Sequence, residues 1–216
     1  MEESTGSLTD TALNILRDQI QNCVFMPGQH INEKEICELT GLGRTPVREA
    51  LQALQREGSI QIFPRRGIQV TPFTYRSVDE IYQVRKLLEP TVCSQYYLRM
   101  DKETLLDFDS QFRCGPQYSD REYFGLDVGF HKWLMASCEN SRVIEFYNDI
   151  MHAQYRFSMY TSKLGTVVRR DYYDEHHRII EALLTENPQS IQSALTSHIR
   201  YSQSIALQTM QKINTL

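Results

Sequence analysis

The sequence predicts a mainly α-helical protein in which an N-terminal winged helix-turn-helix precedes an antiparallel, all-helical bundle of about six helices. Apolar residues recur at helical spacing through most of the 216 residues, often behind N-terminal capping patterns. Only between about residues 60 and 71 does the period change to 2, which is typical of two short strands. We therefore expect one domain over residues 1–74 and a second over residues 75–216.

The composition is typical of a folded cytoplasmic protein. Hydrophobic residues make up 41% of the chain and charged residues 23%, so we expect a packed core rather than disorder. The chain has no run of about 18 apolar residues and its polar N-terminus lacks a secretory pattern, so we expect no membrane partner. The five cysteines are scattered without a CxxC pair, which favours free thiols in the cytoplasm over a disulfide framework.

Periodicity and capping predict the first two helices. Apolar residues at helical spacing indicate the first helix, namely Leu13, Leu16 and Ile20. The turn-forming stretch MPG at 26–28 ends this helix. Asn32 followed by Glu35 is typical of a cap with its partner three residues on, which opens a second helix through Leu39.

A third helix and a hairpin complete the first domain. Thr45 is the expected cap of this helix, Pro46 suits its first position, and Gly58 ends it. Its buried face follows from the helical spacing of Val47, Ala50, Leu51 and Leu54. Two strands then alternate apolar and polar residues on either side of the turn sequence PRRG at 64–67.

The second domain is predicted to contain helices only. Ser77 with Glu80, and Ser119 with Glu122, are capping-box patterns that each open a helix. Asn187 is the expected cap of the last helix, which runs to about residue 212. The other predicted helices cover about residues 102–113, 119–138, 141–163 and 169–186.

The charge is distributed unevenly. The whole chain carries −4, yet residues 44–76 carry six arginines against two glutamates. The flanking segments, 1–43 and 77–216, are both acidic. A short basic segment in an acidic protein is typical of a local phosphate-binding surface.

This basic segment predicts binding to double-stranded DNA. Arg44 and Arg48 lie at the start of the third helix, where they can reach bases or phosphates in the major groove. Lys34 can reach a phosphate, and Arg65 and Arg66 at the wing tip can reach the neighbouring backbone or minor groove. The alternative is a solvated charged face without a partner.

The stretch MPGQHINEKEICELTGLGRTPVREALQALQREGSIQIFPRRGIQV, residues 26–70, resembles the N-terminal domain of the GntR family of bacterial transcription regulators. The run RTPVREAL is the most specific part of this resemblance, and Gly43 departs from it where the family usually has Ser. The resemblance implies operator DNA as the partner, with contacts from Lys34, Arg44, Thr45, Arg48 and Gly67.

Four residues of the second domain predict a metal site. Asp127 and His131 are four apart on one helix face, and His176 and His198 lie on the inward faces of two further helices. Three histidines and a carboxylate inside a bundle suit a divalent transition metal such as Zn, Ni, Mn or Fe. The alternatives are hydrogen-bonded core histidines, or His177 as the ligand in place of its neighbour His176.

The segments EIYQVRKLLEP, LDVGFHKWL, EHHRIIEAL and ALTSHI resemble the FCD domain found in the FadR branch of GntR regulators. This resemblance implies a ligand-binding bundle of the shorter, six-helix type. It also implies Asp127, His131, His176 and His198 as the metal ligands, with His176 rather than His177 in the third position.

An effector pocket is expected beside the metal. The same resemblance implies that Arg85 turns toward the cavity, where it is a natural partner for a carboxylate effector. An exposed ion pair with Glu89 one turn on is an equal alternative. The same cavity is expected to receive side chains from one later helix, namely Asn148, Gln154, Tyr155 and Arg156.

Taken together, the features favour a ligand-responsive transcription regulator, not an enzyme. We expect a homodimer that binds a pseudo-palindromic operator as a repressor and responds to a small carboxylate effector. The alternatives are a regulator that senses the metal itself and a metal-dependent enzyme.

Overall fold

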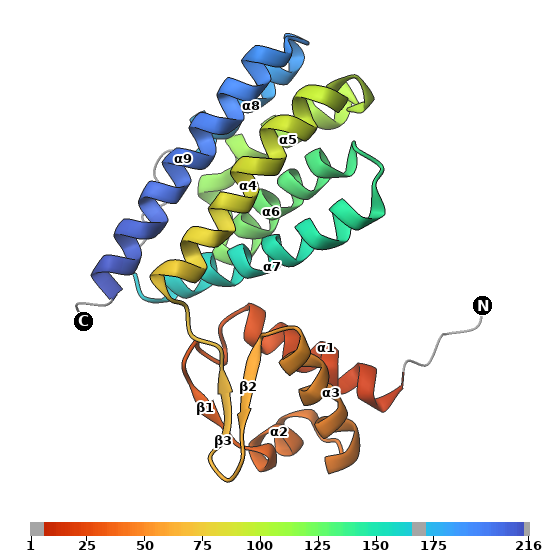
Figure 1. The fold of residues 1–216 in the computed structure, drawn as a ribbon, viewed down its shortest axis with the longest axis vertical. Coiled ribbons are helices and arrows are strands. Elements are labelled where there is room, and N and C mark those ends of the chain that lie inside the picture. The colour runs from red at the N-terminus through yellow and green to blue at the C-terminus, as the bar shows by residue number, and fades with distance from the viewer. Residues whose placement is uncertain (1–6, 166–171, 214–216) are drawn as a thin grey trace. The chain divides into compact units, whose positions relative to one another are not determined.

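The computed structural model describes residues 7–165 and 172–213 of the chain. The chain divides between Phe73 and Thr74 into two compact units, an N-terminal unit and a C-terminal unit. The described residues are mainly helical with one small sheet, which confirms the predicted fold class (Figure 1). None of the helices within these residues has both the length and the apolar composition needed to cross a membrane.

The N-terminal unit is a winged helix-turn-helix. Its elements are α1 (Leu8–Gln21), β1 (His30–Ile31), α2 (Glu33–Thr40), α3 (Arg44–Arg56), β2 (Ile60–Phe63) and β3 (Gly67–Val70). The strands form an antiparallel sheet in the order β1-β3-β2, in which Ile60 lies opposite Val70 and Ile62 opposite Ile68. The hairpin of β2 and β3 is confirmed, whereas β1 has no counterpart among the predicted elements.

Capping determines where α2 and α3 begin. Asn32 and Glu35 exchange hydrogen bonds between side chain and backbone, so the predicted capping box of α2 is confirmed. The expected cap of α3 is wrong: Gly43 is the N-cap and α3 begins at Arg44, so Thr45 lies inside the first turn. Since Gly43 has no side chain, no side-chain group accepts a hydrogen bond from the first amides of α3.

The core of the N-terminal unit forms where α1, α3 and the sheet meet. The predicted apolar face of α3 is fully buried against these elements. The core consists of Ala12, Leu16, Ile20, Ile31, Ile36, Val47, Ala50, Leu51, Leu54, Ile60, Ile68 and Val70. Because this face points inward, the arginines of α3 are left on the outside.

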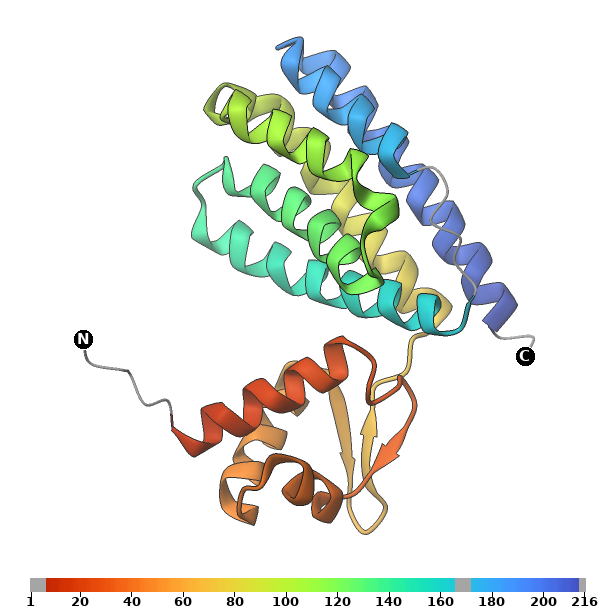
Figure 2. The same ribbon diagram turned by 180° about the vertical axis from the view of Figure 1, so that it is seen from behind.

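The C-terminal unit is a helical bundle (Figures 1 and 2). Its elements are α4 (Tyr75–Tyr96), η1 (Tyr97–Arg99), α5 (Lys102–Arg113), η2 (Gly115–Gln117), α6 (Asp120–Ala136), α7 (Ser141–Lys163), α8 (Tyr172–Leu184) and α9 (Pro188–Ile213). The two long helices α4 and α9 pack along one another, α6 packs on α7, and α8 packs on α5 and α9.

Two of the three predicted caps in this unit are confirmed. Ser119 forms its capping box with Glu122, and the side chain of Asn187 accepts a hydrogen bond from the amide of Ser190. The cap expected at Ser77 is wrong, because Thr74 caps α4 and Ser77 is its partner inside the helix.

The bundle interior contains polar side chains as well as an apolar core. One apolar cluster draws on α4, η1, α5, α6, α8 and α9 and includes Phe112, Phe130, Leu134, Ile179, Ile180, Leu183, Ile191 and Leu195. A second joins α6 and α7 and consists of Val128, Met135, Tyr147 and Met151. The polar side chains buried in the same unit include Arg85, Glu89, His131, Gln154, His176 and His198. Since buried polar groups need partners, these side chains mark the place to search for a site.

Candidate DNA-contacting face and candidate metal centre

The predicted DNA-contacting residues are exposed on α2, α3 and the wing. Lys34, Arg44, Thr45, Arg48, Arg65 and Arg66 are all exposed, and Gly67 is half-buried. A groove of about 380 Å³ between α3 and the wing is lined by Arg48, Arg65 and Gly67, among other residues. Helix α3, the expected recognition helix, and the hairpin of β2 and β3, which forms the wing, therefore flank one surface, as a winged helix requires.

The backbone at the wing tip is shaped for a tight turn. Arg65 adopts a left-handed conformation with φ of 66°, and Gly67 has φ of 91°. A Cβ atom at Gly67 would lie 3.3 Å from the carbonyl oxygen of Ile31. Glycine is thus required at position 67 for conformation and for space, in addition to any contact with DNA.

Arg48 is held by an acidic neighbour. Its Nε donates to both carboxylate oxygens of Glu33 on α2, at 3.0 and 2.9 Å. Lys34 is more exposed and forms an ion pair at 3.6 Å with Glu38, one turn along the same helix. The Glu33 contact holds the Arg48 side chain of α3 against α2.

Three of the four predicted metal ligands form one buried cluster. His131 on α6, His176 on α8 and His198 on α9 are at most 2% exposed. One candidate ligand atom from each lies within 4.8 Å of the others. The stacking of Phe112 on His176, with centroids 4.1 Å apart, fixes the plane of that ring. The bundle thus brings together three histidines from distant parts of the chain.

Asp127 borders this cluster. Its Oδ1 lies 2.8 Å from Nε2 of His176 and 3.8 Å from Nε2 of His131. Burial by itself raises the pKa of Asp127, but the hydrogen bond and charge interaction with His176 outweigh burial and hold this pKa well below its usual range. The carboxylate is therefore ionised beside the three imidazoles.

The residues present fit a divalent transition metal. Nε2 of His131 and Nδ1 of His198 are buried with no hydrogen-bond partner among the described residues. Burial lowers the pKa of His131 and, more strongly, that of His198, so both rings are neutral. Neutral imidazoles with free nitrogens beside a carboxylate are the donor set that such metals take.

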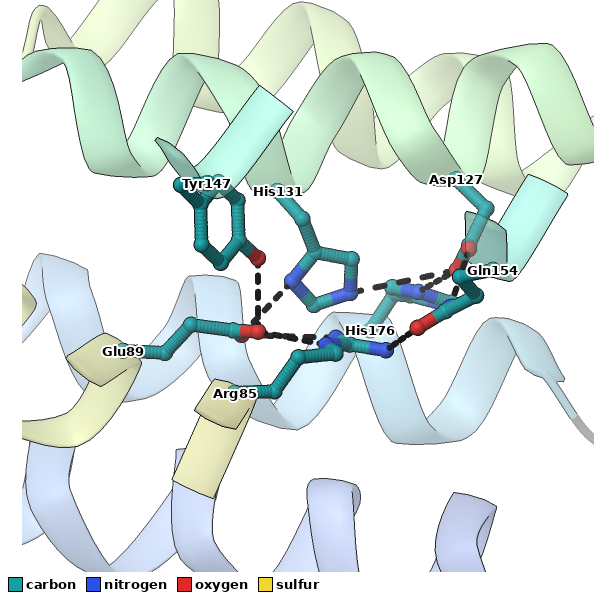
Figure 3. A network of polar contacts seen from close by, with 7 residues as sticks. All are labelled: Arg85, Glu89, Asp127, His131, Tyr147, Gln154 and His176. Carbon is teal, nitrogen blue, oxygen red and sulfur yellow. Dashed lines mark hydrogen bonds and ion pairs between the residues drawn. The ribbon is translucent and has the colours of Figure 1, made fainter. Parts of the chain in front are cut away.

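Glu89 contacts His131 at the ring nitrogen Nδ1. The sequence did not predict this contact. Oε2 of Glu89 lies 2.9 Å from Nδ1 of His131, a close polar contact that departs from the line of an ideal hydrogen bond. Tyr147 donates to the other oxygen at 2.6 Å, as Figure 3 shows. Metal-binding histidines commonly hold such a carboxylate at their second nitrogen.

Arg85 and Glu89 form a buried ion pair, not an exposed one. Both side chains are at most 1% exposed, with Nε of Arg85 2.5 Å from Oε1 of Glu89. Burial lowers the pKa of Arg85 and raises that of Glu89, but the opposite charges outweigh burial in both cases. The spacing of four residues is the same for an exposed and a buried pair, so the sequence left both interpretations open.

Gln154 on α7 connects this pair to the cluster. Its Oε1 accepts from Nη1 of Arg85 at 2.6 Å, and its Nε2 lies 3.4 Å from Oδ2 of Asp127. The polar contacts therefore run from Glu89 through Arg85 and Gln154 to Asp127 (Figure 3).

A small pocket of about 50 Å³ adjoins the cluster and is lined by His198 of the cluster and by the neighbouring Asp127. Arg85 and Gln154 line this pocket as predicted. The other described lining residues are Tyr82, Tyr123, Phe124, Phe157, Ser158, Thr161, Ser202, Ile205, Ala206 and Thr209.

The other residues expected in this pocket lie elsewhere on α7. Asn148, Tyr155 and Arg156 are not among the described residues that line it. The lining residues Gln154, Ser158 and Thr161 share one helix face, and Tyr155 packs with Val128 and Met151 instead. The helical phase of α7 therefore corrects this expectation.

His177 lies outside the cluster. Its side chain is 34% exposed and its Nδ1 lies 2.6 Å from Oδ1 of Asp109 on α5. His176, which precedes it, points into the bundle. The geometry thus favours His176 over His177 as the candidate ligand.

A winged helix-turn-helix joined to a helical bundle is an architecture typical of DNA-binding transcription regulators. Residues 8–70 match the model of the bacterial regulatory proteins of the gntR family, and residues 80–201 match that of the FCD domain. The chain belongs to the GntR family and carries an FCD domain.

Known relatives agree with this assignment. The chain is 29% identical over 198 residues to the HTH-type transcriptional regulator YdhC of Bacillus subtilis, covering 87% of this chain and 86% of the relative. It is 24% identical to the HTH-type transcriptional repressor RspR of Escherichia coli, covering 91% and 87%. It is 26% identical to the gluconate operon transcriptional repressor of Bacillus subtilis, covering 80% and 74%. These proteins are transcription regulators, not enzymes.

Solved structures show the same fold. A GntR transcriptional regulator from Rhodococcus sp. RHA1 superposes with a TM-score of 0.81 at 22% identity, covering 94% of this chain and 98% of that one. McbR/YncC of Escherichia coli superposes with a TM-score of 0.78 at 18% identity, covering 94% and 99%.

Proposed function

We propose that the chain is a homodimeric cytoplasmic repressor that is controlled by a small organic acid. Residues 1–74 bind a pseudo-palindromic operator, with one winged helix on each half-site. Residues 75–216 form the dimer, bind a divalent transition metal through Asp127, His131, His176 and His198, and bind the acid in the adjoining pocket. DNA binding follows from family membership; the metal, the effector and the dimer are the proposed parts.

One observation carries the metal and effector proposal. Three buried histidines from three helices converge within 4.8 Å, and one of them, His198, lines a pocket together with the neighbouring Asp127. A metal bound there supplies a positive charge that an acid's carboxylate oxygen can contact. The chain's own residues orient the site: Glu89 holds His131, Phe112 stacks on His176, and Gln154 contacts Asp127.

The sign of regulation is supported by two relatives whose names state it. RspR and the gluconate operon regulator are both named as repressors. For release from DNA, the effector must bind more tightly to the conformation that has the lower operator affinity. The pocket lies between α4, α6, α7 and α9, so an occupant contacts four helices of the bundle at once.

The DNA part is tested by replacing one recognition-helix arginine. Arg48→Ala should weaken operator binding by about 1–3 kcal/mol, measured by titration of an operator selected from random DNA. Arg142→Ala is the matched control, because Arg142 is also exposed and paired with a glutamate but lies on α7, outside the basic segment. Equal affinities of the Arg48→Ala variant and the wild type would remove this contact from the proposal.

The metal part is tested by elemental analysis of the purified chain. One equivalent of a transition metal is expected in the wild type, and none in the double variant His131→Ala, His198→Ala. A full complement of metal in the double variant would refute the site.

A metal sensor is the second candidate, favoured by the complete burial of the histidines. In that case the metal alone is the signal. Chelation would then abolish operator binding without unfolding the bundle, and no acid would be needed for the response.

A further inference from the structure

One of the predicted DNA-contacting arginines is paired with a carboxylate. Glu33 on α2 forms an ion pair with Arg48 on α3, in which the Glu33 side chain is 30% exposed and that of Arg48 is 62% exposed. In the part of the chain that the structure describes, Arg44, Arg65 and Arg66 have no such partner. These three arginines keep their full charge for phosphates, whereas the charge of Arg48 is balanced before DNA binds.

The ion pair uses only one edge of the Arg48 guanidinium. Nε donates to both carboxylate oxygens of Glu33, at 3.0 and 2.9 Å. Nη1 and Nη2 of Arg48 have no hydrogen-bond partner among the described residues. Because a guanidinium is planar and rigid, a contact that fixes Nε also fixes the direction of these terminal groups. The free end of the guanidinium can therefore donate two parallel hydrogen bonds to an outside partner.

The same pair borders the groove between α3 and the wing. Glu33 and Arg48 both line this groove of about 380 Å³, together with the apolar side chains of Leu51, Ile62 and Phe63. The edge of a guanine in the major groove is neutral and presents the adjacent acceptors O6 and N7, which match two parallel N–H donors. A phosphate is negative, so the carboxylate of Glu33 repels it at this position. The surroundings of Arg48 therefore favour a base edge over a phosphate.

We propose that Glu33 is a positioning residue for sequence recognition. It directs the terminal amino groups of Arg48 toward a guanine in each half-site, and its charge disfavours contact between Arg48 and a phosphate. Glu33 thus raises the preference for the operator and lowers the affinity for DNA of unrelated sequence. The inference rests on the DNA part of the proposed function, because it requires Arg48 to contact the operator.

Base substitutions in the operator test this role. The operator selected by the wild-type full chain is changed at one base pair at a time, and each form is titrated with the wild type and with Arg48→Ala. The guanine assigned to Arg48 is the one whose substitution weakens binding of the wild type but not of Arg48→Ala. For Glu33→Gln, the loss of affinity on substituting this guanine should be at least about fivefold smaller than for the wild type, because the arginine is no longer held in one direction. The affinity of Glu33→Gln for unrelated DNA should rise at least about twofold, since a negative charge has been removed.

Two comparisons separate positioning from charge and from folding. Glu57→Gln is the matched charge control, because Glu57 pairs with Arg17 on α1 at 2.6 Å and is not among the described residues that line the groove. It should leave the loss at the guanine unchanged. Glu33→Gln should also leave the losses at the other base pairs unchanged, because Glu33 acts through Arg48 alone. An equal reduction at every base pair would assign Glu33 to the folding of α2 and overturn the inference.

The outcomes separate this inference from the proposed function. Weaker operator binding by Arg48→Ala together with an unchanged loss at the guanine in Glu33→Gln would overturn the inference and leave Arg48 as a DNA contact. Operator binding by Arg48→Ala as tight as that of the wild type would overturn both the inference and this contact of the proposed function.

Discussion

Two neighbouring histidines on α8 have opposite surroundings, and this difference can be tested directly. His176 is fully buried in the cluster, whereas His177 is half-buried and paired with Asp109 on α5. His176→Ala should lose most of the bound metal, and His177→Ala should retain about one equivalent. Elemental analysis of both variants after dialysis measures this. Retention by the first and loss by the second would exchange their roles.

Glu89 is the residue whose importance only the structure reveals. If it orients His131 for the metal, Glu89→Gln should weaken metal affinity by about 10- to 100-fold, the usual effect of losing such a carboxylate. Competition with a coloured chelator gives this affinity. Tyr147→Phe is the matched control, because it removes another contact to Glu89 but leaves the carboxylate beside His131.

The same substitution also affects stability, which has to be measured separately. Glu89→Gln leaves the Arg85 guanidinium buried without its counter-charge, at a cost of about 3–5 kcal/mol in the free energy of unfolding. Denaturant unfolding of the metal-free chain reports this loss. Equal metal affinity in the folded Glu89→Gln variant and the wild type would show that the ion pair serves stability alone.

At the scale of helices and strands, capping patterns and apolar spacing predicted most elements. They missed elements that exist only because they pair with a distant part of the chain. The capping boxes at Asn32 and Ser119 lie within four residues, so they are visible in the sequence. The two residues of β1 are a strand only because they pair with β3. Ser77 fits the role of cap as well as that of partner, and the structure places the cap at Thr74.

The candidate metal site, too, could be predicted only in part from the sequence. The helical phase predicted that His131, His176 and His198 point inward, because each shares a face with apolar neighbours. Their convergence depends on how three helices pack, which spacing within one helix does not contain. For the same reason the ion pair of Arg85 and Glu89 was open to an exposed interpretation, and three residues of α7 were expected on the wrong face.

The start of α3 carries a prediction at the scale of one element. Gly43 is the N-cap with φ of −69°, and a Cβ atom there would meet nothing within 4 Å. Gly43→Ser should therefore fold normally and change stability by only a few tenths of a kcal/mol. The added hydroxyl at the helix start should raise operator affinity severalfold through a phosphate contact. Titration of the same operator measures this, and an unchanged affinity would place the phosphate elsewhere.

At the scale of the whole molecule, the segment expected to bind DNA and the remainder of the chain carry opposite net charges. The whole chain carries −4, yet the segment 44–76 has six arginines, and the acidic remainder contains the candidate effector site. In the proposed function, regulation requires a free-energy coupling between the effector site and the DNA-contacting face.

Such a coupling is reciprocal, so it can be measured both as the effect of the effector on operator binding and as the effect of the operator on effector binding. If an acid effector lowers operator affinity by a given factor, operator DNA must lower the affinity for that acid by the same factor, typically about 5- to 150-fold. We expect equal factors when the operator is titrated with and without a saturating organic acid that binds the Zn²⁺-loaded chain, and the acid is titrated with and without saturating operator. In the double variant His131→Ala, His198→Ala, both factors should fall to about one while operator binding persists, because the arginines of the N-terminal unit are unchanged. An operator affinity of the wild type that stays the same at saturating acid would show that the pocket does not control DNA release, since a ligand that binds both conformations equally does not shift the equilibrium between them.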